Sequence, residues 1–561
     1  MLLSNLNLLA TAPGGVARLR ELILTLAVQG KLVPQDPVDE PASVLLQKIR
    51  AEKDRLIAEG KIKKDKPLAV IAEEEKPFEL PVGWEWVRIP EVTHSLGQGE
   101  PTEAFSYIDV ASVDNLKGCV ASEIQVLEAT EAPSRARKNV ALGTVIYSTI
   151  RPYLKNIAVI ECDYAPRAIA STAFAVMHPH NGVMSKYLLH YLRSQPFTDY
   201  VNSKAVGVAY PAINDANFFQ GLIALPPEAE QSRIVARVEE LMRLCDALQA
   251  KGQLEATQHA QLLSTLLGTL TASATPEELT DNWQRVAQHF DLLLDRPEAI
   301  DALEQTLLQL AVRGLLVPQD PADEPASVLL QKIRAEKDRL IAAGQIKKDK
   351  PLPPVTDEEK PFELPVGWEW VRFDELIHPQ KPIAYGVLVP GPDVSQGVPF
   401  VRIADLSIAN PPERPEKTIT PEVDAQFPRT RLEGGEILMG VVGSIGKLGV
   451  APKTWAGANI ARAICRIVPA DAGLHEFVLF LLETKFMQES FAGDTRTLAQ
   501  PTLNIGLIRA ALTPMPPPAE QSRIVTRVTQ LRRLCADLRQ RLAEREVVQA
   551  RLAEALAQSV A

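Results

Sequence analysis

Apolar residues recur at alternating spacings of four and three in two distant segments of the chain. The first stripe contains Ile234, Val238, Leu241, Cys245 and Leu248. The second contains Ile524, Val528, Leu531, Cys535 and Leu538. This heptad spacing predicts two long helices with a coiled-coil seam, each of about 40 residues and on the order of 60 Å. Because the two helices match, we predict that they pair with each other in antiparallel fashion. Packing of each helix on its own domain is the alternative.

Shorter helices precede two tryptophan-containing segments. Apolar residues at helical spacing predict one helix over 16–30 and another between Pro41 and Gly60, each ending at a glycine. The second of these helices returns between Pro325 and Gly344. Proline-rich tails follow and are predicted to be linkers, each leading to a pair of tryptophans that anchors a globular module. The tails are 66–81 and 350–365, and the pairs are Trp84 with Trp86 and Trp368 with Trp370.

The chain contains a tandem duplication. Residues 30–88 return at 314–372 with nine of 59 positions changed, and residues 226–248 return in similar form at 516–538. The period is far too long for a solenoid of 20–50-residue units. Two unlike stretches, 89–225 and 373–515, lie between the repeated passages. We interpret this as one duplicated frame that carries two different modules.

Both unlike stretches show mixed α/β patterns, although such short apolar runs identify strands poorly. Predicted strands fall at 107–113, 143–150 and 156–162 in the first module, and at 398–406, 435–443 and 462–469 in the second. Helices are predicted at 186–194 and 475–491. The predicted fold class is α+β, with two mixed α/β modules separated by long antiparallel coiled-coil helices in a pseudo-twofold internal duplication. The predicted boundaries are 1–83 for the first helical segment and linker, 84–225 for the first module, 226–367 for the central helical region and linker, 368–515 for the second module and 516–561 for the C-terminal helix.

The composition is that of an ordinary globular protein, with 46% hydrophobic and 23% charged residues. Every apolar run is interrupted by Arg, Glu or Gln, no secretory signal is visible, and the five cysteines lie far apart. These features predict a cytoplasmic protein without disulfides. A net charge of −10 argues against nucleic acid at first sight. However, no acid occurs between Glu131 and Glu161 or between Glu436 and Asp471, and both windows contain several Arg and Lys residues.

Each cationic window predicts a DNA-contacting patch, because Arg can fork onto guanine, Asn onto adenine, and Lys, Ser and Thr commonly hold phosphates. A solvated surface charge is the plainer explanation for any single Arg. In the first module the candidates are Arg135, Arg137, Lys138, Ser148, Thr149, Arg151, Tyr153, Lys155 and Asn156. In the second module they are Ser444, Lys447, Asn459 and Arg462.

Two late segments, 203–214 and 493–504, add further candidates for DNA contact, namely Lys204, Tyr210, Arg496 and Gln500. Asn214 and Asn504 belong to the same segments, but we favour helix N-capping for them. The glycines of 440–449 would let a backbone approach a ligand closely, and a turn-rich hairpin explains them equally well.

Enzyme motifs fail on inspection. The segment 440–448 lacks P-loop spacing and has Leu448 where Ser or Thr would bind magnesium. Asn410-Pro411-Pro412 is followed by Glu413 instead of the aromatic residue of amino-methyltransferases. Glu74-Glu75-Lys76 lies in a charged linker, and the eight histidines show no metal spacing. The sequence therefore predicts no catalytic residue, no metal site and no bound cofactor.

The segments KPFELPVGWEWVR, RARKNVALGTVIYSTIRPYLKNIAVI, LMGVVGSIGKLGV, QPTLNIGLIRA and PPPAEQSRIV, in this order of parts, resemble a type I restriction–modification specificity subunit. The resemblance covers nearly the whole chain. It implies that the two modules are target-recognition domains, each reading one half of a bipartite, gapped, double-stranded DNA sequence. It also implies that the helices set the spacing and dock DNA methyltransferase (modification) subunits.

The near-identical copies of the frame predict two equivalent docking places, hence two copies of one methyltransferase partner. The resemblance implies S-adenosylmethionine as a cofactor of that partner, and ATP with magnesium where a restriction or translocase subunit joins the complex. A stand-alone bipartite DNA-binding regulator and a scaffold that grips proteins are the two alternatives.

Overall fold

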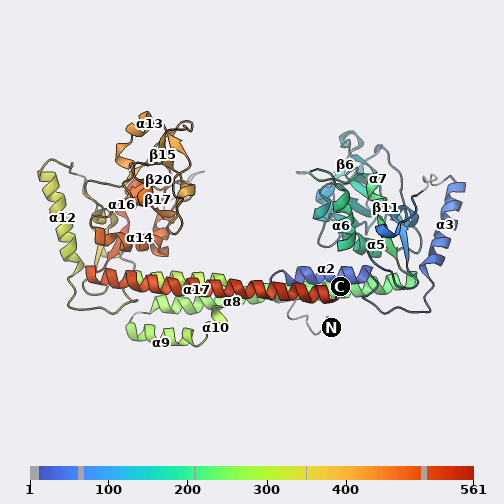
Figure 1. Cartoon of the computed structure of the whole chain (residues 1–561), viewed down its shortest axis with the longest axis horizontal. Coiled ribbons are helices and arrows are strands. Elements are labelled where there is room, and N and C mark those ends of the chain that lie inside the picture. The colour runs from blue at the N-terminus through green and yellow to red at the C-terminus, as the bar shows by residue number, and fades with distance from the viewer. Residues whose placement is uncertain are drawn as a thin grey trace. The chain divides into compact units, whose positions relative to one another are not determined.

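The computed structural model describes residues 12–60, 68–207, 210–273, 275–348, 350–493 and 502–560. The chain divides into two compact units (Figure 1). The first comprises Met1–Glu255 with Arg545–Ala561, and the second comprises Ala256–Glu544. Two long helices, α8 (Glu228–Ala272) and α17 (Pro518–Val560), contribute residues to both units. Within the described ranges, no helix is long and apolar enough to cross a membrane.

The first unit contains a mixed α/β module whose first and last strands pair. Strand β1 runs antiparallel to β12, so the two ends of the module meet beside the start of α8. Its sheets have the orders β2-β11-β8-β9-β5-β4 and β6-β3-β10-β7. The helices are α2 (Gly15–Val28), α3 (Ala42–Ala58), α4 (Ile89–Val92), α5 (Ser185–Arg193), α6 (Gln195–Lys204) and α7 (Asp215–Phe218). The strands are β1 (Glu85–Arg88), β2 (Thr93–His94), β3 (Phe105–Ile108), β4 (Val113–Asp114), β5 (Cys119–Val120), β6 (Val126–Leu127), β7 (Ala136–Asn139), β8 (Val145–Ser148), β9 (Ile157–Val159), β10 (Ala168–Ser171), β11 (Phe174–Pro179) and β12 (Leu222–Leu225).

The second unit repeats this plan with different content. Strands β13 and β21 close the module, and the sheet order β14-β20-β17-β18 corresponds to β2-β11-β8-β9. The helices are α9 (Pro276–Ala287), α10 (Phe290–Leu293), α11 (Pro297–Val312), α12 (Ala326–Ala342), α13 (Pro421–Ala425), α14 (His475–Glu483), α15 (Lys485–Gly493) and α16 (Ile505–Ala510). The strands are β13 (Glu369–Arg372), β14 (Ala384–Tyr385), β15 (Val398–Val401), β16 (Thr418–Ile419), β17 (Ile437–Gly440), β18 (Leu448–Val450), β19 (Asn459–Ile460), β20 (Ile464–Ile467) and β21 (Leu512–Met515).

Most predicted elements are present, and one helix was predicted too long. The six predicted strands appear as β3, β8, β9, β15, β17 and β20, shorter than expected. The helix predicted over 475–491 breaks at Thr484, whose hydroxyl turns back to the Leu481 carbonyl at 2.6 Å. Helices α9 and α10 were not predicted; the Thr275 side chain caps α9 by accepting the Glu278 N–H at 3.2 Å.

The heptad stripes are buried mainly within their own units. In the first unit Ile234, Val238 and Cys245 share a core with α2 and the module. In the second unit Ile524 and Val528 share a core with α11 and the second module, and Cys535 packs with Ile300 of α11. The prediction that each stripe is covered by the other long helix is therefore only partly right. Packing on the helix's own domain, the alternative, describes the first half of each stripe.

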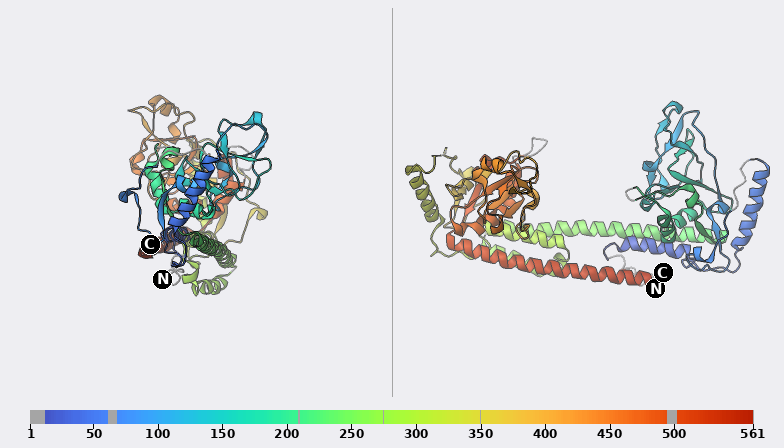
Figure 2. Two further views of the ribbon diagram at one scale, coloured as in Figure 1. Left: turned by 90° about the vertical axis from the view of Figure 1, so that its right-hand side faces the viewer. Right: turned by 45° about the horizontal axis from the view of Figure 1, so that its top comes forward.

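The C-terminal half of each long helix packs near the N-terminal half of the other, which is an antiparallel order. In the first unit, Ala553 of α17 joins the core that contains Cys245, and Arg18 of α2 donates to the Ala550 carbonyl at 2.8 Å. The red end of α17 accordingly lies beside the blue α2 (Figures 1 and 2). In the second unit, Leu267 of α8 joins a core against which Leu531 packs. The residue numbers of the packed positions therefore increase along α8 as they decrease along α17.

A buried hydrogen-bonded anchor joins each module to its long helix. The indole N–H of Trp84 donates to Glu230 at 2.9 Å, and the side-chain amide of Gln35 donates to the other oxygen of that carboxylate at 2.7 Å. Burial raises the pKa of Glu230, against the opposing effect of these donors. The second unit repeats the anchor with Trp368, Gln319 and Glu520 at the same distances.

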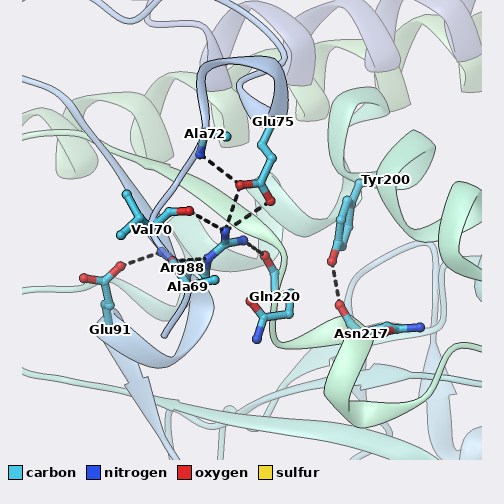
Figure 3. Close-up of polar contacts among 9 residues, drawn as sticks. All are labelled: Ala69, Val70, Ala72, Glu75, Arg88, Glu91, Tyr200, Asn217 and Gln220. Carbon is cyan, nitrogen blue, oxygen red and sulfur yellow. Dashed lines mark hydrogen bonds and ion pairs between the residues drawn. The ribbon is translucent and has the colours of Figure 1, made fainter. Parts of the chain in front are cut away.

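The predicted linkers are docked on the modules by a buried arginine (Figure 3). The guanidinium of Arg88 pairs with Glu75 of the linker at 2.9 Å and donates to the carbonyl of Gln220 at 2.6 Å. The pKa of Glu75 is lowered, chiefly by its hydrogen bond from Arg88. Arg372 and Glu359 form the same pair at 2.9 Å in the second unit. Glu75 of the Glu74-Glu75-Lys76 triplet therefore has a structural role, because it pairs with Arg88.

The anchor predicts a matched pair of stability losses. Trp84→Phe and Trp368→Phe each leave a buried carboxylate oxygen without its donor, at a cost of about 1–3 kcal/mol. Midpoints of urea unfolding of the full chain measure this loss. The Nε1 atom of Trp370 is buried without a hydrogen-bond partner, so Trp370→Phe serves as the control. Equal shifts for all three variants would contradict the assignment.

Candidate nucleic-acid interface

Two loops occupy equivalent places in the two modules. One joins β8 to β9 (residues 149–156), and the other joins β17 to β18 (441–447). Each loop is fixed by the same backbone contact to a later segment. The Ile213 N–H donates to the Thr149 carbonyl at 3.0 Å, and the Leu503 N–H donates to the Val441 carbonyl at 2.8 Å. These pairs align the loops, so that Arg151 of one corresponds to Gly443 of the other.

The first loop presents a stacked cation and exposed apolar side chains. Arg151 and Lys155 adopt φ angles of 49° and 51°, on either side of a single turn of 3₁₀ helix. The guanidinium carbon of Arg151 lies 4.4 Å from the centre of the Tyr210 ring. Tyr210 is 67% exposed and Tyr153 is 51% exposed. Sequence reasoning named these residues without foreseeing that Arg151 and Tyr210 come together.

Ile150, Leu154 and Val206 extend this surface with exposed apolar side chains, and sequence reasoning missed them. The one signal in the sequence was their position beside the cations. The Nζ of Lys155 reaches the Arg193 carbonyl at 3.4 Å, and the carbonyl of Asn156 accepts the Ser148 N–H at 3.0 Å.

Two predicted cations of the first module are neutralised by acids from outside the window. Arg137 pairs with Glu100 at 2.7 Å, and Lys138 pairs with Asp215 at 2.7 Å. The acid-free window therefore overstates the local positive charge, because folding brings acids from elsewhere in the chain. Arg135 and Lys204 are exposed.

Ser148 and Thr149 are internal residues, which corrects their prediction as surface contacts. They are 1% and 7% exposed. Their hydroxyls donate to the carbonyls of Ile150 at 3.0 Å and Ala173 at 2.9 Å. Both hydroxyls shape the start of the loop from inside.

The second loop is a tight glycine-rich turn. Gly443 and Gly446 have φ angles of 75° and 78°. A Cβ on Gly440 would meet the Ser444 carbonyl oxygen at 2.4 Å, so the hairpin explanation of these glycines is confirmed. Ser444 and Lys447 are exposed, and the Nζ of Lys447 donates to the Ile403 carbonyl at 2.9 Å.

Asn459 is fully buried, which corrects its prediction as a DNA contact. Its side chain accepts from the Thr430 hydroxyl at 2.7 Å and donates to Asp424 at 2.8 Å. Arg462 is exposed beside it in sequence. Arg496 and Gln500 lie outside the described residues.

The prediction that Asn214 and Asn504 are helix N-caps is confirmed. Their side chains accept the N–H groups of Asn217 at 2.7 Å and Gly506 at 2.8 Å. Tyr385 was not predicted, although it holds the segment 503–505 of the second module. Its hydroxyl donates to the Leu503 carbonyl and accepts the Ile505 N–H, both at 2.8 Å. Burial raises the pKa of Tyr385.

Comparisons with known proteins find full-length relatives. The chain is 35% identical over 558 residues to the type I restriction enzyme EcoEI specificity subunit of Escherichia coli, covering 97% of this chain and 93% of the relative. It is 36% identical over 554 residues to the EcoAI specificity subunit of Escherichia coli, with the same coverages. No family model matches the chain.

Solved structures with a similar fold include the following one. It is described as "Structural basis underlying complex assembly and conformational transition of the type I R-M system". The alignment has a TM-score of 0.50 and 24% identity, and it covers 86% of this chain and 99% of that chain.

The burial of Asn459 predicts a structural rather than a surface phenotype. Asn459→Ala removes one hydrogen-bond partner from each of Asp424 and Thr430 and should cost about 1–3 kcal/mol. Ser444→Ala, on the exposed loop, should change stability by less than about 0.5 kcal/mol. Thermal unfolding of the two variants measures both effects. Unchanged stability of Asn459→Ala would contradict the internal role.

Proposed function

Because the chain belongs to the family of type I restriction enzyme specificity subunits, we propose that its two modules read the two halves of a bipartite DNA sequence. Family membership gives the chain the DNA sequence-specificity role in a restriction–modification complex. Specificity subunits are generally non-catalytic. The two modules are thus the target-recognition domains, and we propose the loops at 149–156 and 441–447 as their reading edges.

The unlike loops on matching supports are the observation that carries this proposal. The backbone contacts that fix the two loops are the same, whereas most of the side chains that they display differ. The first displays Arg151, Tyr153 and Lys155, and the second displays glycines with Ser444 and Lys447. Two different half-sites require such a difference, because sequence is read by side chains at base edges. Two modest readers joined in one chain bind a gapped sequence far more selectively than either does alone.

We propose further that the repeated frame docks two copies of a methyltransferase subunit. Membership implies DNA and methyltransferase or restriction subunits as partners, and the duplication supports two equivalent places. Leu244 of α8 and Leu534 of α17 occupy the same position in the repeat and are 40% and 60% exposed. Exposed apolar side chains repeated in this way are typical of a protein interface. The long helices, which run unbroken through both units, are proposed to set the spacing between half-sites.

We propose that the partner subunits, and not this chain, carry out the catalytic reactions. We propose that S-adenosylmethionine is used by the methyltransferase subunits, and ATP with magnesium by a restriction subunit where one is present. The complex works on DNA and is accordingly proposed to act in the cytoplasm.

Enrichment from randomised duplexes tests the reading function. The complete methyltransferase complex should enrich a gapped bipartite sequence. Replacing residues 89–225 with the corresponding module of another specificity subunit should change one half only. Firm binding by the isolated chain would favour a stand-alone regulator, and no enrichment by the complex would favour a protein scaffold. A change in both halves would contradict modular reading.

The docking proposal predicts a stepwise loss of partner. Leu244→Asp or Leu534→Asp should each leave one methyltransferase copy bound, and the double variant should bind none, because each removes one apolar contact. Native mass spectrometry of the complex gives the stoichiometry. Ala250→Asp adds the same charge at an exposed position of α8 and is the control. Retention of two copies by the double variant would contradict docking at these leucines.

A further inference from the structure

We propose that Arg151 reads a guanine in the half-site of the first module, with Tyr210 as its positioning residue. This inference rests on the proposed function and deepens it, because it names one base and the side chain that selects it.

The backbone presents Arg151 in an unusual conformation. Arg151 and Lys155 are the non-glycine residues with positive φ among those that the structure describes. Such a conformation costs about 1–2 kcal/mol and persists only where the surroundings impose it. Here the Arg151 N–H donates to the Pro211 carbonyl at 2.8 Å, and Ile150 forms a bridge with Ala212. The loop and the segment that contains Tyr210 are thus fastened together by the backbone of the arginine and of the residue before it.

The guanidinium is held without being neutralised. It lies over the exposed ring of Tyr210 at 4.4 Å, and no ion pair to Arg151 is found within the described ranges. Its Nε atom is buried with no hydrogen-bond partner. Arg137 and Lys138 of the same module are each paired with an acid, which leaves them less able to bind DNA. Stacking on an aromatic ring fixes the plane of the fork without consuming its donors.

The geometry of the Arg151 guanidinium suits a guanine base in particular. Guanine presents two acceptors, N7 and O6, side by side in the major groove, and a planar guanidinium satisfies both. A phosphate also accepts two donors, so the chemistry of the anion alone does not separate the two. The exposed apolar side chains around the fork favour a base edge, since Ile150 and Leu154 carry no donor for a phosphate. The corresponding position in the second module is Gly443, so the second half-site is read by other groups.

Base reading and phosphate binding give opposite outcomes in a substitution test. The complete methyltransferase complex, carrying the wild-type chain or Arg151→Lys, is used to enrich randomised duplexes. Arg151→Lys keeps the charge and removes the fork. We expect it to lower the preference for guanine at one position of one half-site by roughly 5- to 100-fold, with the rest of the sequence unchanged. Tyr210→Leu should weaken the same preference less strongly, because it removes only the stack. Arg167→Lys changes an exposed arginine of the same module and is the matched control.

Three results would overturn the inference. The first is a half-site of the first module without a G·C pair. The second is uniform weakening of all sequences by Arg151→Lys, which would identify a phosphate contact. The third is no change in any preference. Absence of any bipartite sequence for the wild-type complex would instead sink the proposed function itself. Thermal unfolding of Arg151→Lys, within a degree or two of the wild type, excludes loss of fold as the cause.

Discussion

The hydrogen bonds from Trp84 to Glu230 and from Trp368 to Glu520 are the contacts on which the architecture depends. Each joins the residue just before the first strand of a module to the first turn of a long helix, and both partners are buried. Because the carboxylate is buried, it must keep its donors, and this fixes where each module begins and ends. The pairs β1 with β12 and β13 with β21 lie directly beside these anchors. Exposed side chains between these strands can vary without disturbing the frame, whereas buried ones such as Tyr187 share its core.

This arrangement separates stability from specificity. The frame repeats its buried contacts almost atom for atom, including the Arg88–Glu75 and Arg372–Glu359 pairs that dock the linkers. The loops at 149–156 and 441–447 repeat only their backbone attachment. One loop holds a strained arginine and the other holds glycines, while the core contact of the second loop is made at its start by Val441. Specificity can therefore change by exchanging exposed side chains at little cost to folding.

Patterns that depend on local periodicity could be predicted from the sequence, whereas partners distant in the chain could not. The heptad stripe predicted α8 and α17, and Asn214 and Asn504 were correctly assigned as caps, since both signals lie within a few residues. The cover of each stripe by α2 or α11 required knowledge of packing. The sequence did not show that Arg137 pairs with Glu100. Nor did it show that Asn459 is buried and hydrogen-bonded to Asp424 and Thr430. The pairing of Arg151 with Tyr210 spans 59 positions and has no local signature.

Photo-cross-linking of the complete complex to its bipartite DNA tests the central claim most directly. A photoreactive residue would replace Tyr153 in one loop or Ser444 in the other. The account predicts base cross-links from position 153 confined to one half-site and from position 444 confined to the other. Cross-links from both positions to the same half-site, or only to the gap between them, would contradict it.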